Sequence, residues 1–405
     1  MLVDATADLG IDVALRGIRG HAVAAADVDG DGWTDLFVGT FADRPVDTYR
    51  ERGADGPAPD RLLLGSSAGF TVDPTFEGRL GRTAAALFDD LDGDGDPDLV
   101  ASRNVRHGER QDAPTEIYRN DGGRLVPATV LDGERGGRTV RPVDFDGDGR
   151  RDLVLTEDRW SGAATGLFRN EGGLRFREVS REVGFPPDVS GLGAAVGDLG
   201  GDGVDDLVVG GGNRWFLGDG SGFREASTSP LPWALAGEED DPANVVLVDA
   251  DADGKLDILL GQHFNSTIDG GRPEPIRLFL NRGDGATEPR FDDVTASVGL
   301  PGLSTKSPQL VLLDLDGDGW DDIVTTAAAA GGTETASAPV PLVLYRREGD
   351  NGSLRYEPSA PATGRQYWID AVALDANRDG RQDVFLVEWE PALSSRLFLN
   401  LPAPS

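Results

Sequence analysis

Seven runs of the form D-x-D-x-D-G-x-x-D, two of which have Gly200 or Asn377 in place of the second Asp, recur along the chain, beginning at Asp27, Asp90, Asp144, Asp198, Asp249, Asp314 and Asp375. Short apolar segments separated by Gly, Asp and Asn surround each copy, and no long stretch has helical periodicity. A unit of 51 to 65 residues repeated in this way indicates a repeat architecture, and four short strands per unit are typical of a propeller blade. The sequence therefore predicts an all-β fold, a seven-bladed β-propeller of four-stranded antiparallel blades.

The strands of each blade are expected on both sides of its Asp-rich run. In the first copy, apolar residues at 21–26 precede the run, residues 36–38 follow it, and 61–64 form a third segment. A fourth segment follows a Gly-rich turn in several copies, as at 176–179 and 291–294. Short apolar segments bounded by turn residues favour strands.

The two ends of the chain predict how the ring closes. The last copy stops after 396–400 and lacks a fourth segment, whereas residues 2–6 match the fourth-segment pattern of 291–295. We expect the N-terminal strand to complete the seventh blade, which removes the open edge of that sheet. Residues 1–405 are then expected to form one propeller domain.

The Asp-rich run has the chemistry of a calcium loop. Ca²⁺ takes six to eight oxygen ligands, and alternating Asp residues in a tight loop turn three carboxylates toward one point. Gly32 is expected to allow the sharp turn of the first loop. The ligands expected there are three carboxylates, one backbone carbonyl and a closing carboxylate, from Asp27, Asp29, Asp31, Trp33 and Asp35.

The other six loops repeat this ligand set. The corresponding residues are Asp90, Asp92, Asp94 and Asp98; Asp144, Asp146, Asp148 and Asp152; Asp198, Asp202 and Asp206; Asp249, Asp251, Asp253 and Asp257; Asp314, Asp316, Asp318 and Asp322; and Asp375, Asn377, Asp379 and Asp383. Asn377 offers a neutral oxygen in place of a carboxylate. Gly200 stands where loop 198–206 needs its second Asp, so metal there is expected to be weak or absent. One copy could be an acidic surface turn, but seven in phase predict up to seven Ca²⁺ sites.

These motifs resemble the calcium-binding FG-GAP or VCBS repeats of integrin alpha-chain propellers. Segments 27–36, 277–285 and 291–300 are especially similar to the ASPIC/UnbV-like branch of that family. The resemblance covers essentially the whole chain and implies a propeller that binds Ca²⁺. It does not specify a function, because propellers serve adhesion, scaffolding and catalysis alike. The UnbV-like branch includes members of actinomycete natural-product gene clusters, and only two of the 38 basic residues are Lys, which indicates a GC-rich genome.

Composition restricts the partners and the compartment. With 71 acidic and 38 basic residues the net charge is −33, so nucleic acid is not an expected partner. The absence of Cys excludes disulfides and thiol catalysis. No membrane-spanning segment is expected. Met1 lies almost directly before the expected closing strand, without a signal region. This pattern has two interpretations. In one, a signal peptide has been removed and the protein is secreted; in the other, which is slightly favoured, Met1 is the native start and the protein is cytoplasmic.

The face opposite the calcium loops carries the irregular sequence. Connections such as 41–60, 102–115 and 325–341 are far longer than a hairpin needs, and long loops on a rigid scaffold usually carry function. Basic residues near the starts of innermost strands would form a cationic ring at the mouth of the channel and favour an anionic ligand. The ligand-binding candidates on this face are Arg19, Arg82, Arg138, Lys306, Arg365, Trp160 and Trp389. The competing interpretation is that each Arg pairs with a neighbouring acid, such as Glu134 or Glu239.

Catalytic residues are harder to assign. The candidates for acid–base chemistry near neutral pH are His21, His107, His263 and Tyr367. A structural or solvated role is the competing interpretation for each His. The sequence has no G-x-S-x-G elbow, no H-E-x-x-H motif and no nucleotide fingerprint, so no organic cofactor is expected.

Three hypotheses about function follow. The first is a calcium-binding propeller whose loop face and central funnel bind a ligand, either a small molecule or a partner protein or glycan. The alternative is a cofactor-independent tailoring enzyme of natural-product biosynthesis, of the polyketide or enediyne type, that uses Arg, His and Tyr groups in the funnel. The third is a purely structural propeller. The sequence leaves open whether the protein is an enzyme.

Overall fold

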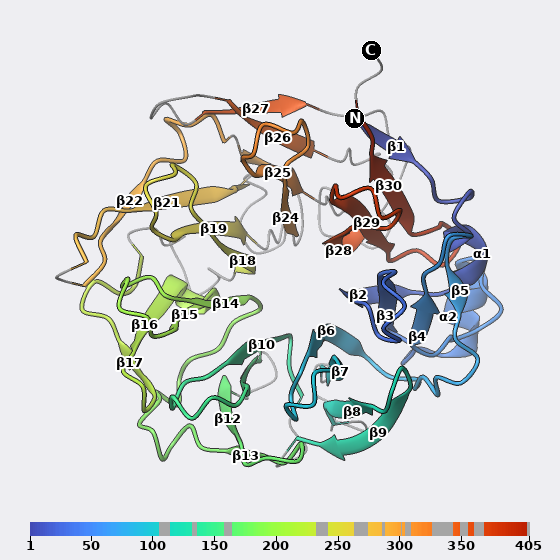
Figure 1. Cartoon of the computed structure of the whole chain (residues 1–405), viewed down its shortest axis with the longest axis horizontal. Coiled ribbons are helices and arrows are strands. Elements are labelled where there is room, and N and C mark those ends of the chain that lie inside the picture. The colour runs from blue at the N-terminus through green and yellow to red at the C-terminus, as the bar shows by residue number, and fades with distance from the viewer. Residues whose placement is uncertain are drawn as a thin grey trace.

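The computed structural model describes residues 1–104, 114–131, 136–157, 164–231, 242–262, 274–285, 288–300, 302–303, 309–325, 343–348, 355–359 and 368–402. Within these ranges the strands form seven four-stranded antiparallel sheets, numbered here sheet 1 to sheet 7 from the first Asp-rich loop onward. The sheets are arranged around a central axis, with the first strand of each nearest the centre (Figure 1). This arrangement confirms the prediction of an all-β propeller with four-stranded antiparallel blades.

The innermost strands lie side by side around the axis. They are β2 (Gly20–Ala26), β6 (Thr83–Asp89), β10 (Thr139–Val143), β14 (Ala194–Gly197), β18 (Pro242–Val248), β24 (Leu310–Leu313) and β28 (Trp368–Leu374). Each contacts the next in this order, and β28 contacts β2, so the ring is closed. Small residues suit the crowded axis, as in Ala22 and Ala24 of β2, which are both buried.

The second strand of each sheet begins at the ninth residue of an Asp-rich loop. These strands are β3 (Asp35–Thr40), β7 (Asp98–Arg103), β11 (Asp152–Thr156), β15 (Asp206–Val209), β19 (Asp257–Gln262), β25 (Asp322–Thr325) and β29 (Asp383–Glu388). They lie between two other strands and between neighbouring sheets. All six residues of β3 are buried, for example, which explains the continuous apolar pattern of these segments.

The third and fourth strands complete each sheet toward the rim. The third strands are β4 (Arg61–Leu64), β8 (Glu116–Asn120), β12 (Gly166–Asn170), β16 (Arg214–Gly218), β21 (Arg277–Asn281), β26 (Val343–Glu348) and β30 (Arg396–Asn400). The fourth strands are β5 (Thr71–Val72), β9 (Leu125–Val130), β13 (Phe176–Glu178), β17 (Phe223–Glu225), β22 (Phe291–Asp293), β27 (Arg355–Ser359) and β1 (Leu2–Asp4). A further pair, β20 (Glu274–Pro275) with β23 (Gly302–Leu303), lies outside the sheets of the ring.

The N-terminal strand closes sheet 7, as predicted. Leu2 pairs with Asn400, Val3 with Leu399 and Asp4 with Phe398, so β1 is the outer neighbour of β30. Because the first and last strands of the chain share one sheet, β30 is paired on both sides and β1 forms the outer edge of the sheet.

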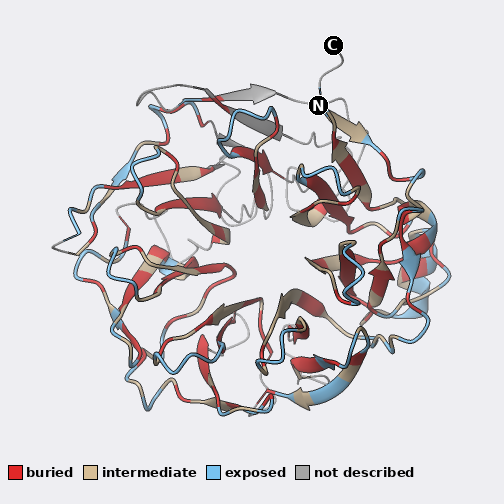
Figure 2. Ribbon diagram, in the orientation of Figure 1, coloured by how far each residue is buried: buried red, intermediate tan, exposed pale blue. Residues whose placement is uncertain are grey.

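The hydrophobic core is divided into layers between neighbouring sheets. The layer between sheets 1 and 2, for example, contains Phe37, Leu62, Leu99 and Tyr118. Comparable layers join the other neighbouring sheets, including sheet 7 with sheet 1. Buried strands alternate with exposed loops in Figure 2. The ring is therefore stabilised chiefly by sheet-to-sheet packing.

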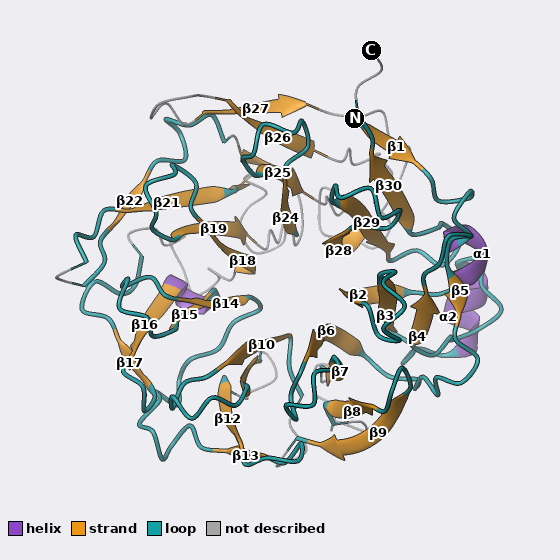
Figure 3. Cartoon of the chain, viewed as in Figure 1, coloured by secondary structure: helices purple, strands orange, loops and turns teal. Residues whose placement is uncertain are grey.

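Helices are short and lie at the rim. The two α-helices among the described residues are α1 (Ile11–Ala14) and α2 (Val46–Glu51), both beside sheet 1 (Figure 3). A 3-10 turn spans Gly211–Asn213. None of the described helices has the length and hydropathy that crossing a bilayer would require.

Candidate metal loops and the opposite face

The seven Asp-rich loops share one backbone geometry. The first Asp of each accepts the N–H of the sixth residue on Oδ2, at 2.8–3.0 Å, as in Gly32 to Asp27 at 2.9 Å. The fifth-position Asp accepts the N–H of the seventh residue on Oδ1, at 2.8–3.0 Å, as in Trp33 to Asp31. Loop 198–206 follows the same pattern although Gly200 replaces its second carboxylate.

Left-handed backbone at the fourth and sixth positions produces the tight turn. The sixth residue is Gly in every loop, with φ between 81° and 96°. The fourth is Gly in five loops, but Ala252 (φ 60°) and Arg378 (φ 59°) occupy it in the other two. A side chain in this conformation costs roughly 1–2 kcal/mol, so Gly is the favoured residue at both positions.

The ninth Asp ties each loop to its own sheet. Its Oδ1 accepts a backbone N–H from the third strand or the residue after it, as Asp35 does from Gly65 at 2.8 Å. In six loops its Oδ2 also accepts the N–H of the second loop residue, as Asp35 does from Val28 at 2.8 Å. Burial, with neighbouring loop carboxylates, raises the pKa of Asp35 to about 6 and that of Asp152 to about 7.

Carboxylate oxygens converge in five of the loops. Oxygens of Asp27, Asp29 and Asp31 lie within 4.8 Å of one another, and so do those of Asp90, Asp92 and Asp94. In three further loops the first, third and ninth positions converge: Asp144, Asp146 and Asp152; Asp249, Asp251 and Asp257; Asp314, Asp316 and Asp322. The ligand set predicted for each loop is thus brought together in part.

The donor set fits a hard cation. Four buried carboxylate oxygens in these loops lack a hydrogen-bond partner: Oδ1 of Asp27, Oδ1 of Asp146, Oδ2 of Asp152 and Oδ1 of Asp251. A buried, unpaired carboxylate oxygen is costly unless a cation or donor meets it. Residues at the first, third, fifth and ninth positions would hold Ca²⁺, which prefers such all-oxygen sites.

Two loops depart from this set, as the sequence predicts. Loop 198–206 lacks the second carboxylate, and the space beside Gly200 is open to a side chain: a Cβ there would lie 3.7 Å from Oδ2 of Asp206, an ordinary contact. In loop 375–383, Asn377 accepts the N–H of Asp379 at 3.0 Å, as Asp29 does from Asp31. Asn377 therefore occupies the position of a ligand carboxylate.

The opposite face begins where the innermost strands begin. Arg19, Arg82 and Arg138 each directly precede an innermost strand, β2, β6 or β10, at the end away from the Asp-rich loops. Lys306, Arg365, Trp160, His107, His263 and Tyr367 lie outside the described residues, as do Glu134 and Glu239.

Aromatic and guanidinium groups stack at this end of sheets 7, 1 and 2. The rings of His21 and Phe41 are parallel, with centroids 3.8 Å apart, and the Arg82 guanidinium lies 4.2 Å from the Phe41 centroid. Trp389 makes T-shaped contacts with His21 and Phe41, and the Arg19 guanidinium lies 3.9 Å from the centroid of the Trp389 ring. Trp389 is only 9% exposed and Arg19 only 2%. We call these five residues the stacked cluster.

Charge around the stacked cluster is partly neutralised. Arg82 forms an ion pair with Asp43 at 3.0 Å and donates to Asn104 at 3.0 Å. Pairing with a neighbouring acid is therefore confirmed for Arg82, with Asp43 as the partner. Burial, then the charges of Arg138 and Arg82, lowers the pKa of His21 well below its usual value, so this imidazole is neutral.

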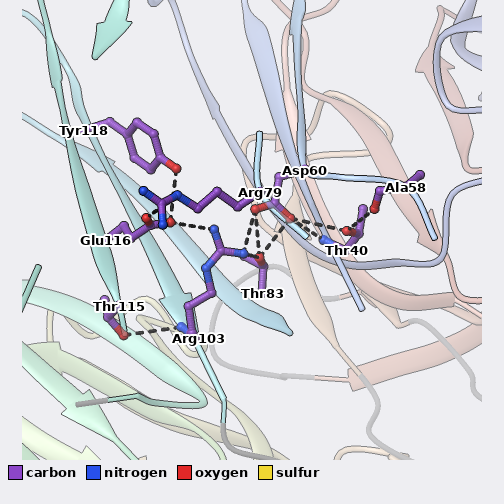
Figure 4. A network of polar contacts seen from close by, with 9 residues as sticks. All are labelled: Thr40, Ala58, Asp60, Arg79, Thr83, Arg103, Thr115, Glu116 and Tyr118. Carbon is purple, nitrogen blue, oxygen red and sulfur yellow. Dashed lines mark hydrogen bonds and ion pairs between the residues drawn. The ribbon is translucent and has the colours of Figure 1, made fainter. Parts of the chain in front are cut away.

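A buried polar network between sheets 1 and 2 was not apparent from the sequence (Figure 4). The guanidinium of Arg103 pairs with Asp60 and with Glu116, both at 2.8 Å, and all three side chains are at most 5% exposed. Thr83 and Tyr118 donate to these carboxylates at 2.8 and 3.1 Å. No motif marks these residues, because they come from four separate segments.

A recurring Asn was also overlooked, although the sequence shows it. The third strands of four sheets end at Asn120, Asn170, Asn281 and Asn400. Each side-chain amide donates to a backbone carbonyl in the Asp-rich loop of the preceding sheet, at 2.7–3.0 Å. The signal was the repeated Asn at the end of the third apolar segment.

Fold and loops together define a class of protein, a β-propeller with an Asp-rich loop between the first two strands of each sheet. FG-GAP-like repeat models match residues 90–155, 144–209 and 314–386, and an FG-GAP repeat model matches residues 19–49. The chain belongs to the FG-GAP repeat family. Membership in the UnbV-like branch stays a prediction.

Integrin alpha chains are among its relatives. The chain is 32% identical to integrin alpha-V of Gallus gallus over 156 residues, which is 34% of this chain. It is 30% identical to integrin alpha-7 of Rattus norvegicus over 182 residues, or 42% of this chain. Each match spans 14% of the integrin's length, so it concerns only a part of those proteins.

Solved structures share the fold of this chain. One is an Agrocybe aegerita lectin that recognises non-reducing terminal N-acetylglucosamine, with a TM-score of 0.51, 17% identity and coverage of 92% of this chain and 86% of the lectin. Another is BBS1N in complex with ARL6DN, with a TM-score of 0.56, 11% identity and 96% coverage of both chains. At such identities the likeness shows the fold alone.

Proposed function

We propose that this protein is a calcium-stabilised recognition module, a single seven-bladed propeller whose face opposite the Asp-rich loops binds a partner. The seven four-stranded sheets and the closed ring of innermost strands support the architecture. The observation that carries the function is the division of chemistry between two faces. Converging carboxylates lie at one end of the innermost strands, and the stacked cluster lies at the other.

Calcium would act here as part of the fold. Five of the loops place three carboxylates within 4.8 Å of one another in a protein of net charge −33. Without a cation, like charges at this distance repel and destabilise the compact state. A site held at 100 times its dissociation constant adds about 2.7 kcal/mol to stability, so several occupied sites would add to the stability that sheet packing provides.

Thermal unfolding with and without chelator tests the calcium part. We expect the melting temperature to fall by 10 °C or more on removal of Ca²⁺, and metal analysis of the untreated protein to find several ions per chain. Mg²⁺ is the matched control, and it should restore less stability because it prefers stricter octahedral geometry. An unchanged melting temperature in a protein without bound metal would refute the calcium proposal.

The opposite face offers cationic and aromatic chemistry. Arg19, Arg82 and Arg138 occupy equivalent positions before three adjacent innermost strands, and Phe41 and Trp389 lie between Arg19 and Arg82. Guanidinium groups pair with carboxylates in a planar, bidentate geometry. We therefore propose a protein partner that presents an acidic side chain, in keeping with the integrin alpha chains among the relatives.

Immobilised peptide panels test the partner part. Asp- and Glu-containing peptides should be retained more strongly than otherwise identical Asn- and Gln-containing ones. Arg82→Gln should weaken this retention at least tenfold, whereas Arg177→Gln, which removes a rim Arg paired with Glu171 and Glu182, should not. Equal retention of acidic and neutral peptides would contradict an acidic partner. Retention of a glycan panel alone would instead favour recognition like that of the Agrocybe aegerita lectin.

The tailoring-enzyme alternative has less support in the described residues. Of its acid–base candidates, only His21 lies within them. One face of the His21 ring is covered by Phe41 and the ring makes a T-shaped contact with Trp389, so the imidazole is held by packing. Binding is therefore the function that the geometry favours.

A further inference from the structure

The Asp-rich loops differ in the basic side chains that contact them. In loop 144–152, Arg169 pairs with Asp146 at 2.7 Å, and Arg150 pairs with Asp148. In loop 249–257, Arg282 pairs with Asp251 at 2.9 Å, and Lys255 pairs with Asp253 at 2.6 Å. Two of the four carboxylates in each loop therefore already have a cationic partner.

Loops 27–35 and 90–98 lack such pairs. Within the described ranges, no basic side chain forms an ion pair with Asp27, Asp29 or Asp31, and Trp33 takes the position of Arg150. The Arg378 guanidinium lies beside Gly32 and 5.3 Å from the Trp33 ring centroid, and within the same ranges it occupies no carboxylate oxygen of this loop. Arg119, the counterpart of Arg169, forms its ion pair with Asp121 at 3.4 Å, and its charge acts on Asp92 of loop 90–98 without an ion pair. The fifth-position carboxylates, Asp31 and Asp94, join the converging groups in these two loops.

The basic partners change what the loop offers a cation. In loop 144–152 the converging group is Asp144, Asp146 and Asp152, and Asp148 is not part of it. Oδ2 of Asp146 forms the ion pair with Arg169, while Oδ1 of Asp146 is buried without a hydrogen-bond partner. Loop 249–257 repeats this arrangement with Asp251. Each loop thus keeps a cation-binding geometry with less negative charge.

We propose that the calcium loops fall into two affinity classes, with loops 27–35 and 90–98 binding Ca²⁺ tightly and loops 144–152 and 249–257 binding it weakly. This inference rests on the proposed calcium function. Calcium affinity in oxygen sites follows ligand charge and rigidity. A unit positive charge about 6 Å from Ca²⁺ weakens binding by roughly tenfold even at the dielectric constant of water.

Calcium titration of the whole chain by calorimetry tests the two classes. We expect a tight and a weak set of sites, with dissociation constants that differ by at least tenfold. Tb³⁺ emission excited through tryptophan adds a signal from loops 27–35 and 314–322, which contain Trp33 and Trp320, whereas loops 144–152 and 249–257 contain no Trp. In a Trp320→Phe background the signal reports on loop 27–35. Ca²⁺ should displace this Tb³⁺ signal over the concentration range of the tight set.

Charge removal in one weak loop provides the decisive variant. The double variant Arg150→Gln/Arg169→Gln should move one Ca²⁺ from the weak to the tight set at unchanged stoichiometry. The variant Arg150→Lys/Arg169→Lys keeps the positive charge and should leave the Ca²⁺ affinity of loop 144–152 weak. Arg177→Gln is the control away from the loops. Retention of the Tb³⁺ signal of loop 27–35 shows that the variant is folded.

The outcomes separate the inference from the calcium function. Absence of Ca²⁺ binding at every loop refutes the calcium function itself. One class of identical sites, or a Gln variant with unchanged or weaker binding, overturns only the two-class inference. If the Gln variant binds Ca²⁺ with unchanged or weaker affinity, the basic residues act by positioning the carboxylates.

Discussion

The side-chain amide of Asn120, at the end of β8 in sheet 2, donates to the backbone carbonyl of Val28 at 2.7 Å. Val28 is the second residue of loop 27–35 in sheet 1. The backbone N–H of Asn120 also donates to Asp98, the ninth residue of its own loop, at 2.8 Å. One residue therefore joins the Asp-rich loops of two neighbouring sheets, and three other Asn residues repeat the arrangement.

Substitution of Asn120 should loosen this junction. Asn120→Ala leaves the buried carbonyl of Val28 without its donor, which should lower the free energy of unfolding by about 1–3 kcal/mol. Urea denaturation in saturating Ca²⁺ measures the change. Thr129→Ala, in which the lost hydroxyl is exposed, is the control and should cost less than 0.5 kcal/mol. A variant as stable as the parent protein would show that sheet packing alone holds the loops together.

The buried network around Arg103 makes a sharper prediction. Arg103→Met removes the cation between Asp60 and Glu116 and leaves both carboxylates buried, so it should destabilise the protein by about 3–5 kcal/mol. Arg79→Gln removes an ion pair to the same Glu116 from a side chain that is 56% exposed, and should cost about 1 kcal/mol or less. Chemical denaturation of both variants compares them directly. Equal losses would contradict the central role of Arg103.

Position 200 should tolerate substitution of its Gly by a residue with a carboxylate. Gly200→Asp supplies the second ligand that loop 198–206 lacks, and the backbone there is not left-handed. We expect one additional Ca²⁺ per chain and a melting temperature that rises in Ca²⁺ but not in chelator. Gly200→Asn, a neutral donor like Asn377, should give a smaller gain. If the metal content stays unchanged, the missing carboxylate is not what limits this loop.

Asp370 should make stability depend on pH. This half-buried carboxylate on β28 accepts the N–H groups of Val23 and Ala371 at 3.0 and 2.9 Å. Burial outweighs these bonds and the nearby charge of Arg141, and raises the pKa of Asp370 to about 7. The folded state therefore holds this proton more tightly than the unfolded state, and the contribution of Asp370 to stability falls as pH rises from about 4 to about 7.

Comparison with Asp370→Asn isolates this effect from the other carboxylates. Relative to the parent protein, the free energy of unfolding of the Asn variant should rise by about 1–2 kcal/mol between pH 4 and pH 8. This is less than the full pKa shift of Asp370 implies, because the carboxyl group is partly solvated. Denaturation curves at several pH values in constant Ca²⁺ measure the difference. A difference that does not change with pH would mean that Asp370 keeps its ordinary pKa.

The chain's repeats made much of the fold predictable. Strand number per unit, the Asp-rich loops and closure by residues 2–4 all follow from patterns that recur along the sequence, because every blade meets the same packing environment. Tyr49 shows the limit of such reasoning: its long connection predicts a functional loop, yet the ring is buried and its hydroxyl donates to the Phe41 carbonyl at 2.8 Å.

The sequence by itself determined the propeller architecture and the carboxylate composition of the loops. A local run of nine residues is enough to place three carboxylates together, since the turn and its glycines are contiguous in the chain. Only the tertiary structure decided which charges those carboxylates meet and which side chains stack on the opposite face. Arg169 reaches Asp146 from another strand, Asn120 reaches Val28 from another sheet, and Trp389 reaches His21 around the closed ring. Such contacts depend on how sheets are placed beside one another, and a repeat pattern alone does not encode them.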